Sequence, residues 1–207
     1  MPRDGTATRN RILDSAERLV LEHGFGATSV DAVIAASKSS KGAFFHHFSS
    51  KDDLGRALVA RYAAADIAHL EQYMARAEAE SDDPARQVVA FVRLFEEDAD
   101  DIVAAQPSCL YVSFINERQL DPEGAAEPIV AAILAWRERL LELLRAAGER
   151  SALPPDLDLE ALADHVFVTF EGAFILARSL QDGAHMRRQL RLVRMLLEQV
   201  LAVRAEA

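Results

Sequence analysis

The segment from Thr28 to Phe48 constrains the fold of this chain more than any other stretch of its sequence. It reads as two short helices joined by a tight turn, and a further helix begins at Ser50. Thr28 is expected to cap the first short helix and Ser40 the second. In the second helix Phe44 and Phe48 lie one turn apart, so they share an inward face. The segment therefore predicts two helices that pack through one side and leave the other side free.

The free side of the second helix carries little bulk. At about 100° per residue, Gly42, Ala43 and His46 point away from the two phenylalanines, and Lys41 borders them. A helix with so small an outward face can lie deep in the major groove of DNA. The pattern predicts a recognition helix.

The distribution of charge supports the same surface. The chain has 23 basic and 33 acidic residues and a formal net charge of −10. Up to residue 51, however, basic residues outnumber acidic ones, and all three lysines fall at Lys38, Lys41 and Lys51. Attraction to phosphate is local, because salt screens charges beyond about 10 Å. A basic tip on an acidic body can therefore bind DNA, although charge alone equally fits an ordinary solvated helix face.

The N-terminal residues resemble the DNA-binding domain of the TetR family of bacterial transcriptional regulators. The resemblance runs in order and without a gap through the apolar helix Ile12–Val20, Gly24-Phe25, Thr28-Ser29-Val30, Ser40–Phe48 and Ser50–Leu54. So many matches in sequence are far more specific than an isolated helix-turn-helix pattern.

The resemblance implies which residues contact DNA. In the family, phosphates are contacted at the positions of Thr28, Phe45, His47 and Lys51, and bases or phosphates at those of Lys41, Gly42, Ala43 and His46. With the cap of the second helix and a lysine in the turn, the candidate DNA-binding residues are Thr28, Lys38, Ser40, Lys41, Gly42, Ala43, Phe45, His46, His47 and Lys51.

The chain departs from the family at two of these positions. Ser37-Lys38-Ser39 stands where the family usually has Ala-Gly-Val, and Phe45 stands where it usually has tyrosine. Either Lys38 takes the left-handed conformation of the glycine, at a cost of about 1 kcal/mol, or the turn is rebuilt. Phe45 lacks the hydroxyl that would bond a phosphate. Neither change argues against DNA binding.

Beyond residue 51 nearly every segment has a helical pattern. Ser50 and Asp53 form a capping box for a long helix that runs to about residue 79, and Asp83-Pro84 opens another. No strand pattern occurs. We expect an all-α fold of about nine helices, with a three-helix helix-turn-helix domain at residues 1–50 and a helical effector-binding and dimerisation domain at residues 51–207.

The last two expected helices carry a surplus of apolar residues. Residues 166–177 are apolar around nearly the whole helix, and the final helix has two apolar rows. This favours a homodimer through a four-helix bundle, which the resemblance also implies. The alternative is that both helices complete one large core. The candidate interface residues are Phe174, Leu190, Val193 and Leu197, and the arginines between 187 and 194 are expected to form a solvated edge.

The sequence has no pattern of a catalytic or metal site. No Glu precedes a His by three residues, as di-iron bundles require, and the acidic run at residues 96–101 lacks the glycine and alternating ligands of a calcium loop. Walker, dinucleotide and nucleophile-elbow motifs are missing. The start is polar and no apolar run has the length of a membrane span. We expect a cytoplasmic protein that is not an enzyme, is not in a membrane, and uses no cofactor or metal.

These patterns favour a dimeric transcriptional repressor that binds a palindromic operator in double-stranded DNA and is released by a small-molecule effector. The alternative is a helical enzyme or small-molecule carrier with a vestigial DNA-binding domain. The effector pocket is expected between the helices of residues 51–182. Candidate lining residues, each of which is otherwise plain core, are Phe91, Phe95, Cys109, Tyr111, Phe114, Trp136 and Phe170.

Cys109 is the only cysteine, so no internal disulfide is possible. Its surroundings, Pro107-Ser108-Cys109-Leu110, resemble a Gly-Cys-Leu segment in a branch of the family that includes an electrophile-responsive repressor. A reactive thiol needs a nearby cation or a helix N-terminus. Pro107 indicates a helix start close by, but no Lys, Arg or His lies within four residues. The favoured interpretation is a buried, inert cysteine.

Overall fold

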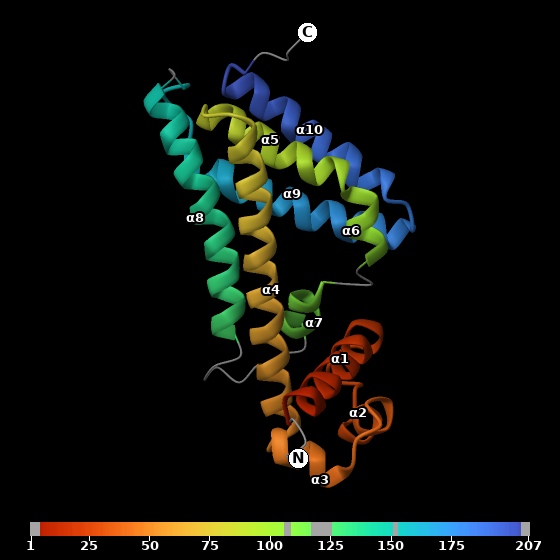
Figure 1. The fold of residues 1–207 in the computed structure, drawn as a ribbon. Helices are drawn as coiled ribbons and strands as arrows, with labels where there is room; N and C mark the ends of the chain where they lie inside the picture. Colours follow the sequence, from red (N-terminus) through yellow and green to blue (C-terminus); the bar gives the residue numbers. More distant parts are fainter. Residues whose placement is uncertain (1–4, 106–108, 117–125, 151–152, 204–207) are drawn as a thin grey trace. The chain divides into compact units, whose positions relative to one another are not determined.

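The computed structural model describes residues 5–105, 109–116, 126–150 and 153–203, and all regular structure within them is helical (Figure 1). The helices are α1 (Gly5–His23), α2 (Val30–Ala36), α3 (Lys41–His47), α4 (Lys51–Glu80), α5 (Pro84–Glu97), α6 (Ala99–Ala105), α7 (Leu110–Asn116), α8 (Ala126–Arg150), α9 (Leu159–Leu180) and α10 (Ala184–Val200). The expected all-α fold is confirmed. Asp98 alone separates α5 from α6.

The described residues divide into two compact units. Unit 1 consists of residues 5–65, 109–116 and 126–132, and unit 2 of residues 66–105, 133–150 and 153–203. Two helices, α4 and α8, contribute to both units. No helix among the described residues is long and apolar enough to cross a membrane.

Unit 1 is built around the inward face of α1. Ile12, Leu13 and Ala16 of this helix are buried, and Phe44 and Phe48 pack into the same core from α3 and its C-terminal cap. α1 contacts α2, α3 and α7, as the red, orange and green segments in Figure 1 show. The inward pair expected from the sequence therefore anchors α3 and determines which of its faces is free.

Side-chain caps explain where several of the helices begin. Ser40 caps α3 by accepting a hydrogen bond from the Ala43 amide at 3.1 Å, as expected. Asp83 caps α5 and Asp158 caps α9. The expected cap of α2 was wrong. Ser29 fills that position, because its hydroxyl accepts from the Ala32 amide at 3.1 Å.

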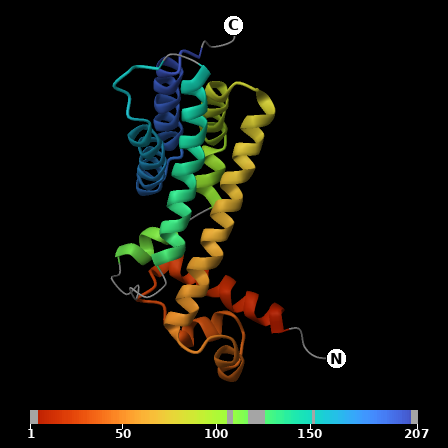
Figure 2. The same ribbon diagram turned by 90° about the vertical axis from the view of Figure 1, so that its left-hand side faces the viewer.

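Unit 2 is a bundle in which α10 packs on α5 and α9 (Figures 1 and 2). The C-terminal half of α4 runs beside α8, and Arg139 of α8 forms ion pairs with Glu71 and Glu78 of α4. α9 ends at Leu180 and is capped by Gln181, whose φ of 55° is left-handed, and α10 begins at Ala184. Residues 181–183 thus separate the two helices.

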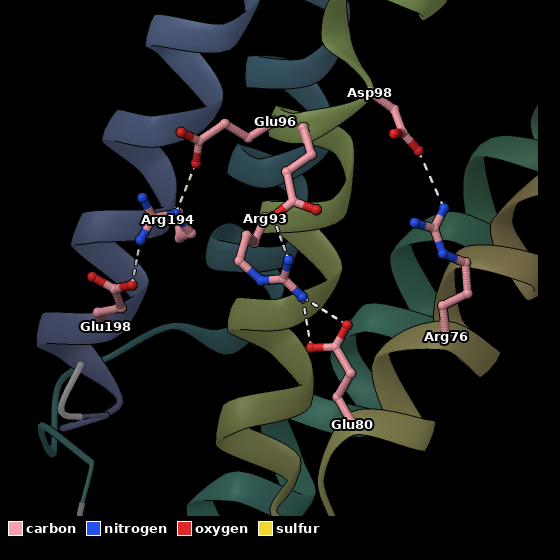
Figure 3. Close-up of polar contacts among 8 residues, drawn as sticks. Arg76, Glu80, Arg93, Glu96, Asp98, Arg194 and Glu198 are labelled. Atoms are coloured by element: carbon pink, nitrogen blue, oxygen red, sulfur yellow. Dashed lines mark hydrogen bonds and ion pairs between the residues drawn. The ribbon is translucent and has the colours of Figure 1, made fainter. Parts of the chain in front are cut away.

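A buried carboxylate ties α10 to α5 (Figure 3). Glu96 accepts hydrogen bonds from Arg191 and Arg194 at 2.8 Å each, and Arg194 also pairs with Glu198. Burial alone would raise the pKa of Glu96, but the hydrogen bonds from the two arginines outweigh burial and lower it. The expected solvated edge holds for Arg191, whose side chain is 58% exposed, but is wrong for Arg194, whose side chain is 21% exposed and is bound to a buried carboxylate.

Candidate nucleic-acid interface and ligand pocket

The turn between α2 and α3 keeps the geometry that a glycine usually provides. Lys38 has a φ of 51°, so it adopts the left-handed conformation at a cost of about 1 kcal/mol. The hydroxyls of Ser37 and Ser39 are hydrogen-bonded at 2.9 Å, and Arg11 donates to the Ser37 carbonyl at 3.0 Å. These contacts stabilise the turn, and Lys38 itself remains exposed. The first of the two alternatives left open by the sequence is the one observed.

One face of α3 is exposed and carries the candidate base-contacting residues. Lys41, Gly42, Phe45 and His46 are exposed, and Ala43 is half-buried. A side chain added at Gly42 would meet only the Ser40 hydroxyl, at 4.0 Å. The fold therefore does not require a glycine there, and any larger residue would project from the free face of the helix.

Thr28 does not belong to this surface. It is only 5% exposed, and its hydroxyl donates a hydrogen bond to the Gly24 carbonyl at 2.8 Å. The donor that a phosphate contact needs is committed inside the protein, so Thr28 leaves the candidate DNA-binding set. Its physical role is to close the loop between α1 and α2.

Lys51 also supports that loop. Its ammonium donates to the Gly26 carbonyl at 3.0 Å and lies 4.6 Å from the centre of the Phe25 ring. An ammonium has three N–H donors, so the observed hydrogen bond leaves donors for a phosphate. Lys51 is therefore both a structural lysine and a candidate anchor.

His47 and Arg9 determine the charge near the C-terminal end of α3. Partial burial and the charges of His46 and Arg9 lower the pKa of His47, which favours its neutral imidazole at pH 7. Arg9 is exposed, and its guanidinium lies 5.3 Å from the centre of the Phe48 ring. The sequence offered no motif for Arg9 beyond its charge, and it was missing from the expected set.

A pocket lies within unit 2, between α5, α8, α9 and α10. Four of the expected lining residues meet there: Phe91 and Phe95 from α5, Trp136 from α8 and Phe170 from α9. The other residues around the pocket are Val92, Leu140, Ala163, Val166, Phe167 and Leu190. The cavity volume is about 20 Å³, which is space for one or two water molecules.

Three expected lining residues lie elsewhere, in unit 1. Tyr111 packs edge-on against Tyr62, with ring centres 5.0 Å apart, and Phe114 packs against Phe25 at 4.7 Å. Cys109 is buried. These three residues do not line the pocket of unit 2, because helical spacing shows that a residue is buried but not which core it joins. A ligand contact at any of them stays a prediction.

The aromatic residues of the pocket are joined to α4. The indole N–H of Trp136 donates to Asp66 at 3.2 Å, and Phe95 stacks on Tyr73 with ring centres 3.9 Å apart. Burial and the hydrogen bond to Asp98 raise the pKa of Tyr73, so its phenol stays protonated. Two side chains of α4 thus hold two walls of the pocket.

The residues expected at a dimer interface are buried within one chain. Phe174, Leu190, Val193 and Leu197 are at most 4% exposed, so no surface is left on them for a second copy. The same helices expose a different apolar row, from 39% to 64% exposed: Val168, Ile175, Leu176 and Leu180 on α9, and Leu192, Met195 and Leu196 on α10. Gly172, in the middle of the α9 row, has nothing within 4 Å of the position of a Cβ.

Among the described residues no group of three or more His, Cys, Asp or Glu side chains has the geometry of a metal site. The described residues present three candidate binding surfaces: the small basic face of α3, the apolar pocket of unit 2, and the exposed apolar row of α9 and α10.

Comparison with protein families matches residues 12–58 to the bacterial regulatory proteins of the tetR family, and residues 84–193 to the tetracyclin repressor-like C-terminal domain. The transcriptional regulator AcuR of Cereibacter sphaeroides is 26% identical over 178 residues, which cover 84% of this chain and 78% of that protein. The HTH-type transcriptional repressor AcnR of Corynebacterium glutamicum is 41% identical over 59 residues, 28% of this chain and 31% of that protein. The crystal structure of a TetR-family transcriptional regulator from Agrobacterium tumefaciens superimposes with a TM-score of 0.75 at 24% identity and covers 95% of this chain and 99% of its own.

Proposed function

Because this chain belongs to the tetR family of bacterial regulatory proteins, we propose that it is a dimeric repressor, released from a palindromic operator when a small effector enters the pocket of unit 2. It acts where the DNA is, in the cytoplasm. The observation that carries the proposal is the exposed face of α3, with its small residues at Gly42 and Ala43 and its cation at Lys41.

On this proposal α3 lies in the major groove. Its free face has no bulk at Gly42 to hold the helix away from the bases, and His46 is exposed on the same side. Lys38, Lys41 and Lys51 provide charge for the flanking phosphates, and the capped N-terminus of α3 adds backbone amides. Phe45 is 45% exposed and offers an apolar contact where the family usually has a hydroxyl.

The proposed dimer uses the exposed rows of α9 and α10. On α9, Val168, Gly172 and Ile175 follow one another at intervals of four and three residues. On α10, Met195 and Leu196 lie three and four residues after Leu192. Residues at these intervals share one helix face. A second copy covers both rows in a four-helix bundle, and the open space at Gly172 allows its helices to approach closely.

The proposed signal passes from the pocket to α4. A ligand that moves Trp136 or Phe95 acts on Asp66 and Tyr73, which are their partners on α4. α4 is one continuous helix from Lys51 to Glu80, and it is the element through which the ligand is proposed to affect DNA binding.

A binding experiment tests the proposal. The DNA upstream of the protein's own gene is titrated at several salt concentrations, with a scrambled duplex of the same length as control. A specific, salt-dependent shift with two copies per site is expected. Binding that is equal on the scrambled duplex, or the absence of binding, contradicts the proposal and favours a carrier that uses the pocket alone.

A further inference from the structure

The pocket of unit 2 presents almost no polar surface. Its lining is aliphatic and aromatic, and includes no Lys, Arg, His, Asp or Glu among the described residues. The one polar lining atom of a side chain is the indole nitrogen of Trp136, and its N–H already donates to Asp66. The backbone groups nearby belong to helices, where they bond one another. A polar ligand atom would therefore lose its water without gaining a partner.

Two charged residues near the pocket, Arg137 and Glu96, already have charged partners. Arg137 of α8 pairs with Glu160 at 2.9 Å, and its Nε lies 2.9 Å from Asp164 without hydrogen-bond alignment. Glu96 of α5 is held by two arginines of α10. A ligand carboxylate or ammonium in the pocket would thus have to break an existing ion pair to find a counter-charge.

The size of the cavity sets a second condition. A space of about 20 Å³ would admit one or two water molecules, but a buried water needs two to four polar partners. The cavity is therefore suited to apolar contents. Phe167 and Phe170 of α9 are only half-buried, so they can rotate toward solvent and enlarge it without opening the core.

We propose that the pocket binds an uncharged, apolar molecule of about one aromatic ring and rejects charged molecules of the same size. The class of ligand is inferred from the pocket itself. Only the role of that ligand as the effector rests on the proposed function. Burying an unpaired carboxylate costs several kcal/mol, whereas an apolar ring gains from each contact with the surrounding aromatic side chains.

Trp136 makes the proposal directly measurable, because it is the only tryptophan of the chain and lies in the pocket wall. The full-length protein, without DNA, is titrated with toluene and separately with benzoate, which has the same ring and a carboxylate in place of the methyl group. Toluene is expected to change the tryptophan emission saturably. Benzoate is expected to bind at least about a hundredfold more weakly.

A matched pair of variants locates the site. Ala163 and Ala177 both lie on α9 and are both fully buried, but only Ala163 lines the pocket. Ala163→Val is expected to weaken toluene binding by at least about tenfold, since it fills the cavity, and Ala177→Val to leave it within about twofold. If circular dichroism shows that Ala163→Val does not fold, Phe170→Ala tests the same site by enlarging the cavity instead of filling it. By enlarging the cavity it is expected to let naphthalene bind as well as toluene.

The outcomes separate cleanly. Equal binding of benzoate and toluene overturns the proposed ligand class, and an absence of toluene binding overturns the pocket. The proposed location of the binding site is overturned if Ala163→Val and Ala177→Val weaken toluene binding equally. It is also overturned if Phe170→Ala leaves naphthalene binding unchanged. A further outcome is that toluene affinity changes in the variants as expected while toluene fails to release the protein from DNA. That result supports the binding site and contradicts the effector role in the proposed function.

Discussion

α3 and the α9–α10 pair expose opposite kinds of surface. The free face of α3 is narrow, with Gly42 at its centre and cations at Lys38 and Lys41 beside it. The free faces of α9 and α10 are lined by large aliphatic side chains such as Val168 and Met195, both more than half exposed. In each case the opposite face of the helix is buried.

The difference shows what each surface lacks in a single chain. A face without bulk and with positive charge complements a polyanion with a groove. A face of aliphatic side chains is unfavourable in water, and covering it with another apolar surface lowers the free energy. On the proposed function both faces are interfaces that a single chain leaves uncovered, so substitutions on α3 should impair DNA binding and substitutions on α9 or α10 should impair dimer formation.

The largest expected effect comes from placing a charge in the narrow face. Gly42→Glu is expected to raise the Kd for the upstream DNA by at least about a hundredfold, because a carboxylate would face the phosphates and hold the helix out of the groove. Circular dichroism and the oligomeric state should not change, since position 42 is exposed and a Cβ there meets only the Ser40 hydroxyl, at 4.0 Å. Gly42→Ala is the control for bulk without charge. Undiminished binding by Gly42→Glu would show that α3 does not enter the groove.

Neighbouring leucines on α10 test the other face. Leu196 is 45% exposed, whereas Leu197 is fully buried. Leu196→Arg is expected to give a folded monomer by sedimentation, with operator binding weakened by roughly a hundredfold because the second half-site is no longer linked to the first. Leu197→Arg buries an unpaired charge and is expected to unfold the chain. A folded monomer from Leu197→Arg, with a dimer from Leu196→Arg, would reverse the assignment of the two faces.

The same contrast explains what the sequence could and could not predict. α2 and α3 were predictable because their signals are local: Ser40 caps one helix end, and Phe44 and Phe48 mark one buried face. Even there, a one-residue error occurred at the cap of α2, where Thr28 and Ser29 are both good caps and only the structure shows which hydroxyl points at the helix.

The inward side of α9 and α10 was not predictable in this way. Both helices carry apolar residues on two sides, and spacing does not tell which row meets the core of one chain and which meets solvent. Leu197 and Leu196 differ by one position and are opposite in exposure. The pocket shows the same limit, because Phe95 and Phe114 have similar helical patterns but lie in different units.

Glu96 holds the apolar row of α10 in place and provides a smaller effect. Its pKa is lowered in the fold, so its contribution to stability is present above its unfolded pKa, near 4.5, and is lost as the pH falls through the lower folded value. Glu96→Gln is expected to cost about 2 kcal/mol of unfolding free energy at pH 7 and to flatten the acid dependence below pH 4.5. Denaturation in urea at several pH values measures both.

Its neighbour is the natural control. Glu97 is exposed and pairs with Arg93 one turn away, so Glu97→Gln is expected to change the unfolding free energy by less than about 0.5 kcal/mol. A loss of equal size in both variants would mean that the buried carboxylate has no special role in fixing α10.

The smallest expected effect separates two lysines of the basic tip. Lys41 is exposed on α3, whereas Lys51 also holds the loop between α1 and α2 through the Gly26 carbonyl and the Phe25 ring. Each lysine replaced by alanine is expected to lower the salt slope of DNA binding by about 1 per half-site. Only Lys51→Ala is also expected to lower stability, by about 0.5–1 kcal/mol, because a hydrogen bond and a cation–π contact are lost. Binding at several salt concentrations, paired with thermal unfolding, distinguishes the two roles. An unchanged salt slope for Lys51→Ala, together with the stability loss, would make Lys51 a structural residue alone and confine the phosphate contacts to the exposed lysines.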